Sequence, residues 1–168
     1  IKYKKTKKNY KMLLVGDIGN TETKICLVDL KKKIIKRINF SSKNISKIQL
    51  KKKFNKLKIK NLTLEKCLFS SVVPKTFIVV KKYIKKHYKI KCFELKDLHI
   101  NKLIKIKVNK KQIGSDRLAN AIGSMNNKDN FIILDFGTAT TFDVIVKNVY
   151  HGGIISPGIK LSLNTLIT

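Results

Sequence analysis

Hydrophobic residues fall into short runs separated by lysine-rich polar stretches. Runs rich in β-branched and aromatic residues predict strands at 13–16, 24–30, 34–40, 67–73, 90–95, 131–134, 144–146 and 149–156. Apolar positions at helical spacing predict helices at 46–57, capped by Ser46, at 77–88, from Ser115 or Asp116 onward, and at 159–167. Because hairpins join the first strands and helical crossovers join later ones, the pattern predicts an α/β fold.

One arrangement occurs twice along the chain. An apolar strand leads into Asp17-Ile18-Gly19 and then a polar turn, and another leads into Asp135-Phe136-Gly137 in the same way. Gly137 can adopt a positive φ, which would point backbone N–H groups outward beside threonine hydroxyls to hold a phosphate. Asp135 could hold a cation there. An ordinary hairpin, with Asp and Gly as turn formers, is the alternative for either copy alone.

The repeat predicts two like half-domains, with one hairpin on each side of a nucleotide's phosphates. We expect the first half-domain at 12–95, a connection at 96–112 and the second half-domain at 113–168. The second half stops soon after its motif, so we expect the chain to be part of a longer protein. Residues 1–11 are expected to be a disordered or non-native extension before Met12.

Asp116 lies at the expected start of a helix and has two interpretations. It is a helix cap with Arg117 as its charge partner, because carboxylates are favoured at helix N-termini. Alternatively, it is an acid/base carboxylate that faces the cleft between the two halves. The residue pattern favours the cap.

The net charge is +28, and among 38 basic residues only Arg37 and Arg117 are arginines. The abundance of Lys, Asn and Ile suggests an AT-rich genome. The lysines are scattered and lack an aromatic stacking pattern, which favours solvated surface over a dedicated polyanion site.

Cys26, Cys67 and Cys92 show no paired spacing and are expected to be reduced, buried thiols. The histidines form no metal-ligand pattern, and no apolar run approaches the ~18 residues of a membrane span.

Five motifs, in this order, resemble the type III pantothenate kinases of the acetate and sugar kinase/Hsp70/actin superfamily. They are DIGNTETK at 17–24, SSVVP at 70–74, GSDRLAN at 114–120, DFGTATTFD at 135–143 and GGIISPG at 152–158. The resemblance covers the chain from Met12 and implies duplicated ribonuclease-H-like (actin-like ATPase) half-domains with mixed sheets, the second incomplete. It also implies a cytoplasmic homodimer, while the scattered lysines and the short apolar runs lead us to expect no specific nucleic-acid partner and no membrane partner.

The resemblance further implies ATP-dependent phosphorylation of pantothenate to 4'-phosphopantothenate, the first step of coenzyme A biosynthesis. Asp116 resembles the catalytic base, Asp135 the ligand of a monovalent cation (potassium or ammonium), and Gly114, Ser115, Asp116 and Arg117 the pantothenate-binding segment. The implied ATP contacts, with magnesium on the phosphates, are Asp17, Ile18, Gly19, Asn20, Thr21, Glu22, Thr23, Lys24 and Thr138. Lys107 stands where the family often has a substrate-contacting tyrosine, and Ser115 where it often has alanine.

Two alternatives stay open at this point. One is a related nucleotide-binding protein that regulates without turnover, and the other is a basic nucleic-acid-binding protein on the same scaffold. An intact Asp116 between the two phosphate motifs favours the enzyme.

Overall fold

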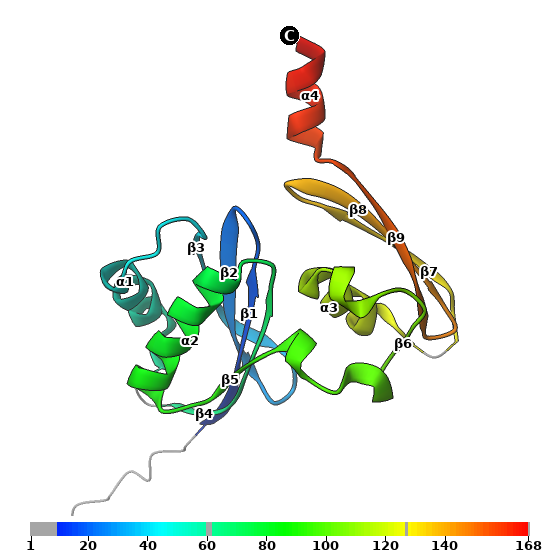
Figure 1. Cartoon of the computed structure of the whole chain (residues 1–168). Coiled ribbons are helices and arrows are strands. Elements are labelled where there is room, and N and C mark those ends of the chain that lie inside the picture. The colour runs from blue at the N-terminus through cyan, green and yellow to red at the C-terminus, as the bar shows by residue number, and fades with distance from the viewer. Residues whose placement is uncertain (1–9, 60–61, 127, 168) are drawn as a thin grey trace, which may run out of the picture. The chain divides into compact units, whose positions relative to one another are not determined.

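Two sheets with flanking helices make up the part of the chain that the computed structural model describes, residues 10–59, 62–126 and 128–167 (Figure 1). The chain divides into two units. Of the described residues, unit 1 contains those up to Ile18 and those within 22–69 and 73–93, and unit 2 contains 19–21, 70–72 and those from Glu94 onward. The α/β class and the pair of sheets confirm the expected fold class, whereas the half-domain boundaries stay a prediction.

Unit 1 is built on a five-stranded sheet in the order β3-β2-β1-β4-β5. The strands are β1 (Tyr10–Ile18), β2 (Glu22–Asp29), β3 (Ile34–Ser41), β4 (Leu62–Ser71) and β5 (Cys92–Glu94). Two helices, α1 (Lys47–Leu57) and α2 (Pro74–Tyr88), pack together, with the rings of Phe54 and Tyr83 5.0 Å apart. Their apolar faces and alternate strand residues form one core, which includes the fully buried Leu14, Ile25 and Phe69.

The two helices of unit 1 begin at residues that suit a helix N-terminus, and the sequence predicted this only for α1. Ser46 caps α1 in a capping box, in which its hydroxyl accepts the Gln49 N–H at 3.1 Å and the Gln49 side chain accepts the Ser46 N–H at 3.0 Å. Pro74 is in the first turn of α2, where a residue without an N–H loses no helical hydrogen bond. The helix therefore begins three residues before the expected Phe77.

Unit 2 is built on a four-stranded sheet in the order β6-β9-β8-β7. The strands are β6 (Lys105–Ile106), β7 (Phe131–Phe136), β8 (Ala139–Val146) and β9 (Val149–Pro157). Helix α3 (Ser115–Ser124) follows the short 3-10 turns η2 (Leu95–Asp97), η3 (Ile100–Lys102) and η4 (Lys110–Gln112). The last helix, α4 (Ile159–Ile167), buries none of its described residues.

The predicted repeat is present in the backbone. Strands β1–β2–β3 and β7–β8–β9 are both antiparallel meanders, and each motif aspartate is the penultimate residue of its first strand. Asp17 pairs with Lys24, and Asp135 pairs with Thr141. The sheets differ at their edges, because β4 extends the first sheet beside β1 whereas β6 joins the second sheet parallel to β9.

The turn after Asp135 differs from the sequence expectation. Strands β7 and β8 continue into the motif and leave only Gly137 and Thr138 between them. Gly137 is not among the residues with positive φ, and its N–H donates to the carbonyl of Ala139 at 3.0 Å. This N–H is used within the hairpin, so the expected outward-pointing geometry at Gly137 is wrong.

Two of the three cysteines are neighbours, although the sequence shows no paired spacing. The sulfur atoms of Cys67 and Cys92 lie 2.8 Å apart in the core of unit 1, and both residues are buried free thiols. Cys26, which was also expected to be buried, is only partly buried. None of the helices in the described ranges combines the length and the hydrophobicity that crossing a bilayer requires.

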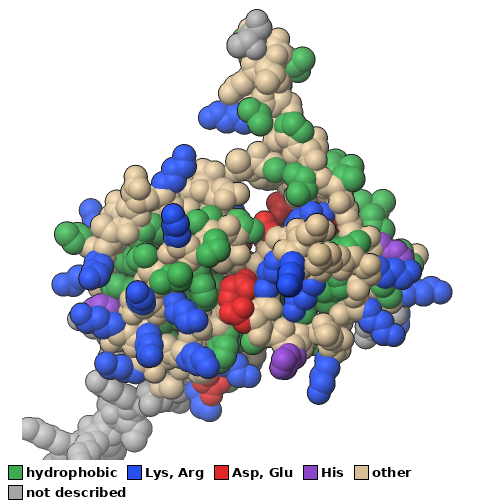
Figure 2. All heavy atoms as spheres, in the orientation of Figure 1, with side chains coloured by type: hydrophobic (Ala, Val, Ile, Leu, Met, Phe, Trp, Pro, Cys, Tyr) green, Lys and Arg blue, Asp and Glu red, His purple; other side chains and the backbone are tan. Residues whose placement is uncertain are grey.

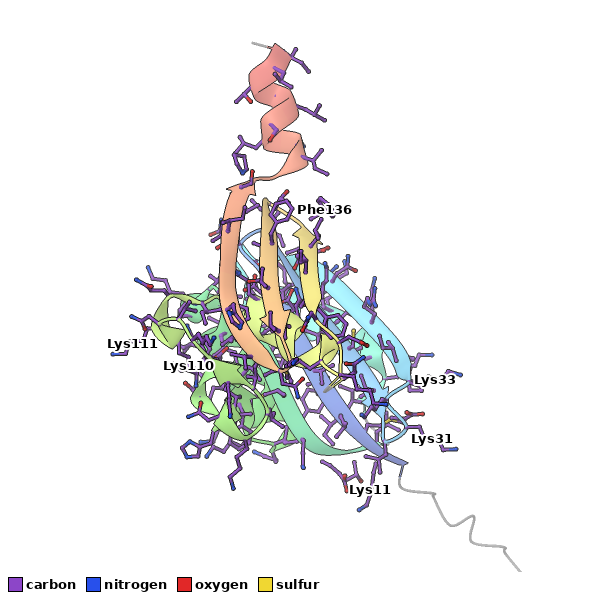
Figure 3. The ribbon with its side chains drawn as sticks, turned by 90° about the vertical axis from the view of Figure 1, so that its right-hand side faces the viewer. Lys11, Lys31, Lys33, Lys110, Lys111 and Phe136 are labelled. Atoms are coloured by element: carbon purple, nitrogen blue, oxygen red, sulfur yellow. The ribbon has the colours of Figure 1, made fainter. Side chains whose placement is uncertain are left out.

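Lysine side chains lie on the surface, as the sequence predicts. They spread over the part of unit 1 that carries α1 and α2 (Figure 2). Lys11, Lys31, Lys33, Lys110 and Lys111 extend away from the ribbon (Figure 3).

Candidate active site

The first turn of α3 presents Asp116. Gly114 is the N-cap residue and offers no side-chain cap, while the Asp116 carboxylate accepts the backbone N–H of Arg117 at 2.8 Å. A Cβ on Gly114 would overlap the Asp116 carboxylate, so glycine leaves room for it. The carboxylate thus lies at the positive end of the helix dipole, a position that acidic residues commonly occupy. Asp116 thus satisfies one N–H of the first turn while its side chain stays only partly buried.

Ser115 is buried beside Asp116, and its hydroxyl donates to the carboxylate of Glu94. Glu94 also accepts the N–H of Lys96 at 2.7 Å and so caps η2. A serine at this position, where the family often has alanine, therefore has a polar partner in this chain. The bond joins the start of α3 to the segment that precedes it.

Arg117 does not pair with Asp116, which corrects the sequence expectation. Its guanidinium lies against the carboxylate of Asp143, with Nε 2.9 and 3.1 Å from the two oxygens and Nη2 2.6 Å from Oδ1. The hydroxyl of Tyr150 donates to the same carboxylate. All three residues are buried, and we name them the Arg117 clamp.

The clamp changes the titration of two of its members. The hydrogen bond with Asp143 raises the pKa of Arg117. Burial, followed by the bond to Asp143, raises the pKa of Tyr150. Arg117 therefore stays a cation and Tyr150 stays a neutral donor across the physiological range.

The sequence prediction did not single out Asp143 or Tyr150. Asp143 is the last residue of the DFGTATTFD motif, so its position within that motif was an available signal. Tyr150 gave no such signal. Its side chain reaches Asp143 because of an irregularity in strand pairing that local sequence does not reveal.

Asp135 is connected to α3. The side-chain amide of Asn120 donates to its carboxylate at 2.8 Å, which joins the GSDRLAN and DFGTATTFD motifs. Opposite Asp135 in the β7–β8 ladder stands Thr141, whose hydroxyl is the one buried side-chain oxygen of the described residues that lacks a hydrogen-bond partner. A carboxylate and an unpartnered hydroxyl are oxygen ligands of the kind that alkali-metal cations take.

Two threonines of the phosphate motifs lie together in unit 2. The hydroxyls of Thr21 and Thr138 are 2.9 Å apart, and both side chains are exposed. Asn20, next to Thr21, is also exposed. These three side chains offer the hydroxyl and amide groups that phosphate oxygens accept.

The other predicted ATP contacts, in the β1–β2 hairpin, differ in their exposure to solvent. Ile18 and Thr23 are fully buried, and the Thr23 hydroxyl is bonded to Ser42 at 2.8 Å. Lys24 is exposed, with its ammonium 3.8 Å from the carboxylate of Glu22. Buried Ile18 and Thr23 leave only their backbone groups for a ligand, whereas the exposed side chain of Lys24 can reach one. Within the described ranges, no group of three or more His, Cys, Asp or Glu residues suits a metal ion.

Residues 13–168 match the family model described as type III pantothenate kinase. The chain belongs to this family. It is 68% identical over 155 residues to the type III pantothenate kinase of Pelagibacter ubique, covering 92% of this chain and 62% of that protein. The Desulforapulum autotrophicum type III pantothenate kinase is 33% identical over 162 residues, with the same coverage of 92% and 62%. The chain thus spans about 62% of the length of these relatives.

One solved structure shares the fold of this member of the type III pantothenate kinase family. The ethanolamine utilization protein EutJ from Carboxydothermus hydrogenoformans superposes with a TM-score of 0.50 at 13% identity, over 92% of this chain and 56% of that chain. At this identity the likeness concerns the fold alone. The family match confirms the resemblance that the five sequence motifs indicated.

Proposed function

We propose that this chain belongs to a kinase that transfers the γ-phosphoryl group of ATP to pantothenate and so begins coenzyme A biosynthesis. Family membership supports the reaction. The observation that carries it is the Asn120–Asp135 hydrogen bond. It holds α3, whose first turn carries Asp116, against the strand end that carries Asp135, so the proposed base and the proposed cation ligand belong to one framework.

The proposed base is Asp116. Phosphoryl transfer depends on positioning and charge neutralisation more than on covalent chemistry. The Asp116 carboxylate orients the terminal hydroxyl of pantothenate and accepts its proton. The other residues of the segment, Gly114, Ser115 and Arg117, contact pantothenate. Arg117, as the cation among them, pairs with the substrate's carboxylate.

Residues 17–24 and Thr138 are proposed to hold the ATP phosphates. Lys24 contributes a mobile positive charge, while Asn20, Thr21 and Thr138 donate hydrogen bonds. Magnesium and a monovalent cation, when bound, supply further positive charge for the transfer. We further propose that the protein acts in the cytoplasm as a homodimer.

Asp135 is the proposed ligand of potassium or ammonium, together with the hydroxyl of Thr141. Replacing Asp135 by alanine should abolish the dependence of rate on potassium, while Asp17→Ala should instead weaken ATP binding. Titrating potassium against the rate for each variant separates these two roles. A wild-type potassium response in the Asp135 variant would exclude Asp135 from the cation site.

The proposed activity is tested by coupled ADP release with and without pantothenate. Because the chain spans 62% of its relatives' length, we would assay it alone and joined to the remainder of the Pelagibacter ubique sequence, hereafter the extended chain. We expect pantothenate-dependent ADP release from the extended chain and none from the 168-residue chain. Equal rates from both would contradict our interpretation of the repeat. ATP binding without any turnover in the extended chain would instead indicate a regulatory protein.

A further inference from the structure

We propose that Asp143 and Tyr150 are positioning residues, which fix the guanidinium of Arg117 so that it selects an acceptor substrate carrying a carboxylate. This inference rests on the proposed function. It adds two residues and a selection mechanism to it, because neither Asp143 nor Tyr150 has a place in the reaction described above.

The first support is the geometry of the clamp. Asp143 binds the guanidinium side-on, through Nε and Nη2. An arginine side chain has five N–H donors in a planar fork, so this pairing leaves the N–H groups of Nη1 and one of Nη2 for another acceptor. In the described part of the chain, no hydrogen bond uses Nη1. The end of the fork is therefore available for a second carboxylate.

Tyr150 makes this second pairing electrostatically possible. Its neutral hydroxyl donates to Asp143, and so draws part of the carboxylate's negative charge away from the guanidinium. Asp143 is 1% exposed and Tyr150 is fully buried, so water does not compete for these bonds. Arg117 is thus held in one orientation at little cost when a substrate binds, since its rotamers are already restricted.

The second support is the cavity that Arg117 lines. It has a volume of about 330 Å³ and is formed within unit 2 by Tyr150, His151, Gly152, Gly153 and parts of segment 108–113. None of its described lining residues is acidic, and Arg117 and His151 are basic. The ammonium group of Lys96 donates to the carbonyls of Lys111 and Ile113, at 3.2 and 2.8 Å, and so fixes one wall. A cavity with this lining favours an anion.

The third support is the local distortion of β9. The pairing register shifts between Val144 and Ile145, so that Gly153 faces Asp143 while Tyr150 faces Ile145. In a regular ladder residue 151 would occupy the position opposite Ile145. Because side chains alternate along a strand, the bulge brings Tyr150 to the same face as Asp143.

The bulge requires both glycines of the GGIISPG motif. Gly152 has a φ of +98°, which other residues rarely adopt. A Cβ on Gly153 would lie 2.7 Å from Nη2 of Arg117 and would also overlap the carbonyl of Phe142. The two glycines therefore leave space for the guanidinium beside the distorted strand.

The test compares Tyr150→Phe and Asp143→Asn in the extended chain, with pantothenate and its neutral alcohol analogue pantothenol as acceptors. We expect each variant to raise KM for pantothenate about tenfold, as loss of a charge-assisted hydrogen bond would. KM for ATP and for pantothenol should change less than about twofold, so the preference for the carboxylate should shrink. Tyr83→Phe, which removes the hydroxyl of a largely buried tyrosine in unit 1, is the control and should leave all these values unchanged.

A purely structural role would give a different pattern, in which the melting temperature falls and both acceptors are affected equally. That result, or an unchanged preference in Tyr150→Phe, would overturn the inference while leaving the proposed function intact. If Asp143→Asn does not fold, Tyr150→Phe decides alone, because phenylalanine fills the same space. Absence of pantothenate-dependent turnover in the unmodified extended chain would overturn both.

Discussion

The carboxylate of Asp116 accepts the N–H of Arg117, and the amide oxygen of an asparagine at this position would accept it as well. Asp116→Asn in the extended chain should therefore keep the fold and ATP binding. The amide cannot take the proton of the attacking hydroxyl, so kcat should fall by ~10²–10⁴-fold, the usual contribution of a general base.

Measurements of kcat, nucleotide affinity and melting temperature on the same Asp116 variant separate catalysis from capping. A variant with most of its kcat and a lowered melting temperature would show that Asp116 only stabilises the helix. The hydrogen bonds of the Arg117 clamp should persist in either case, since its carboxylate belongs to Asp143.

Tyr88 supplies a prediction on alkaline stability. Burial, with a smaller contribution from Tyr83, raises its pKa from 10.0 to about 12. The folded state therefore retains the phenol proton more tightly than the unfolded state. This contribution to stability is fully present below pH 10 and is lost as the pH rises through about 12. The free energy of unfolding should fall over that interval, as denaturant titrations at several pH values would measure.

Tyr88→Phe provides the control, since phenylalanine has no proton to lose. Its free energy of unfolding should fall less steeply between pH 10 and 12 than that of the unmodified chain. Identical slopes in the two proteins would mean that Tyr88 does not titrate in the way its burial implies.

Among the elements, α1 offers a direct test of a sequence signal. Its capping box satisfies two backbone N–H groups at the helix start. Ser46→Ala should lower the free energy of unfolding by about 1 kcal/mol, the usual effect of losing an N-cap side chain. Ser46→Asp keeps an acceptor at the cap and should retain most of the stability. Urea unfolding of all three proteins measures the effect, and equal loss in both variants would contradict the capping role.

Helices and strands were predictable because each depends on a local period. The apolar spacing of α2 and the run at 131–134 both marked real elements, and Ser46 marked a real cap. Strand ends were less predictable, since Asp135 and Thr141 belong to strands only through pairing with each other. The pairing of Lys105 with Val149 in a parallel ladder likewise depends on residues far apart in the chain.

The candidate site was predictable to the extent that motifs carried it. The motifs nominated Asp116 and Asp135 as candidates, which stay predictions, whereas the hydrogen bond from Asn120 that joins their elements had no sequence signal. The sequence suggested Asp116 as the charge partner of Arg117, but the partner in the structure is Asp143, which is 26 residues away. The contact of Tyr150 with Asp143 depends on the bulge in β9, which the sequence did not reveal. Long-range pairs of this kind are set by tertiary packing, which a single sequence does not expose.

At the scale of the whole molecule, the charge of +28 dominates. Helices α1 and α2 carry many lysines and no acidic residue. We expect duplex DNA to bind through non-specific electrostatics, with affinity falling steeply as salt increases. Fluorescence anisotropy between 50 and 200 mM salt, as is usual for this dependence, should give the same curve for unrelated DNA sequences. Tight binding to one sequence that persists at high salt would contradict this expectation.

One contact in unit 1 has a consequence for how the family's sequences vary. A Cβ on Gly16 would overlap the ring of Phe69, which is itself fully buried. Neither position can change freely while the other stays the same. Across aligned relatives, sequences with a side chain at position 16 should carry a smaller residue at position 69, and those that keep the aromatic ring should keep the glycine. The two sites would thus evolve as a linked pair, and independent variation between them would show that the strands can separate to admit both side chains.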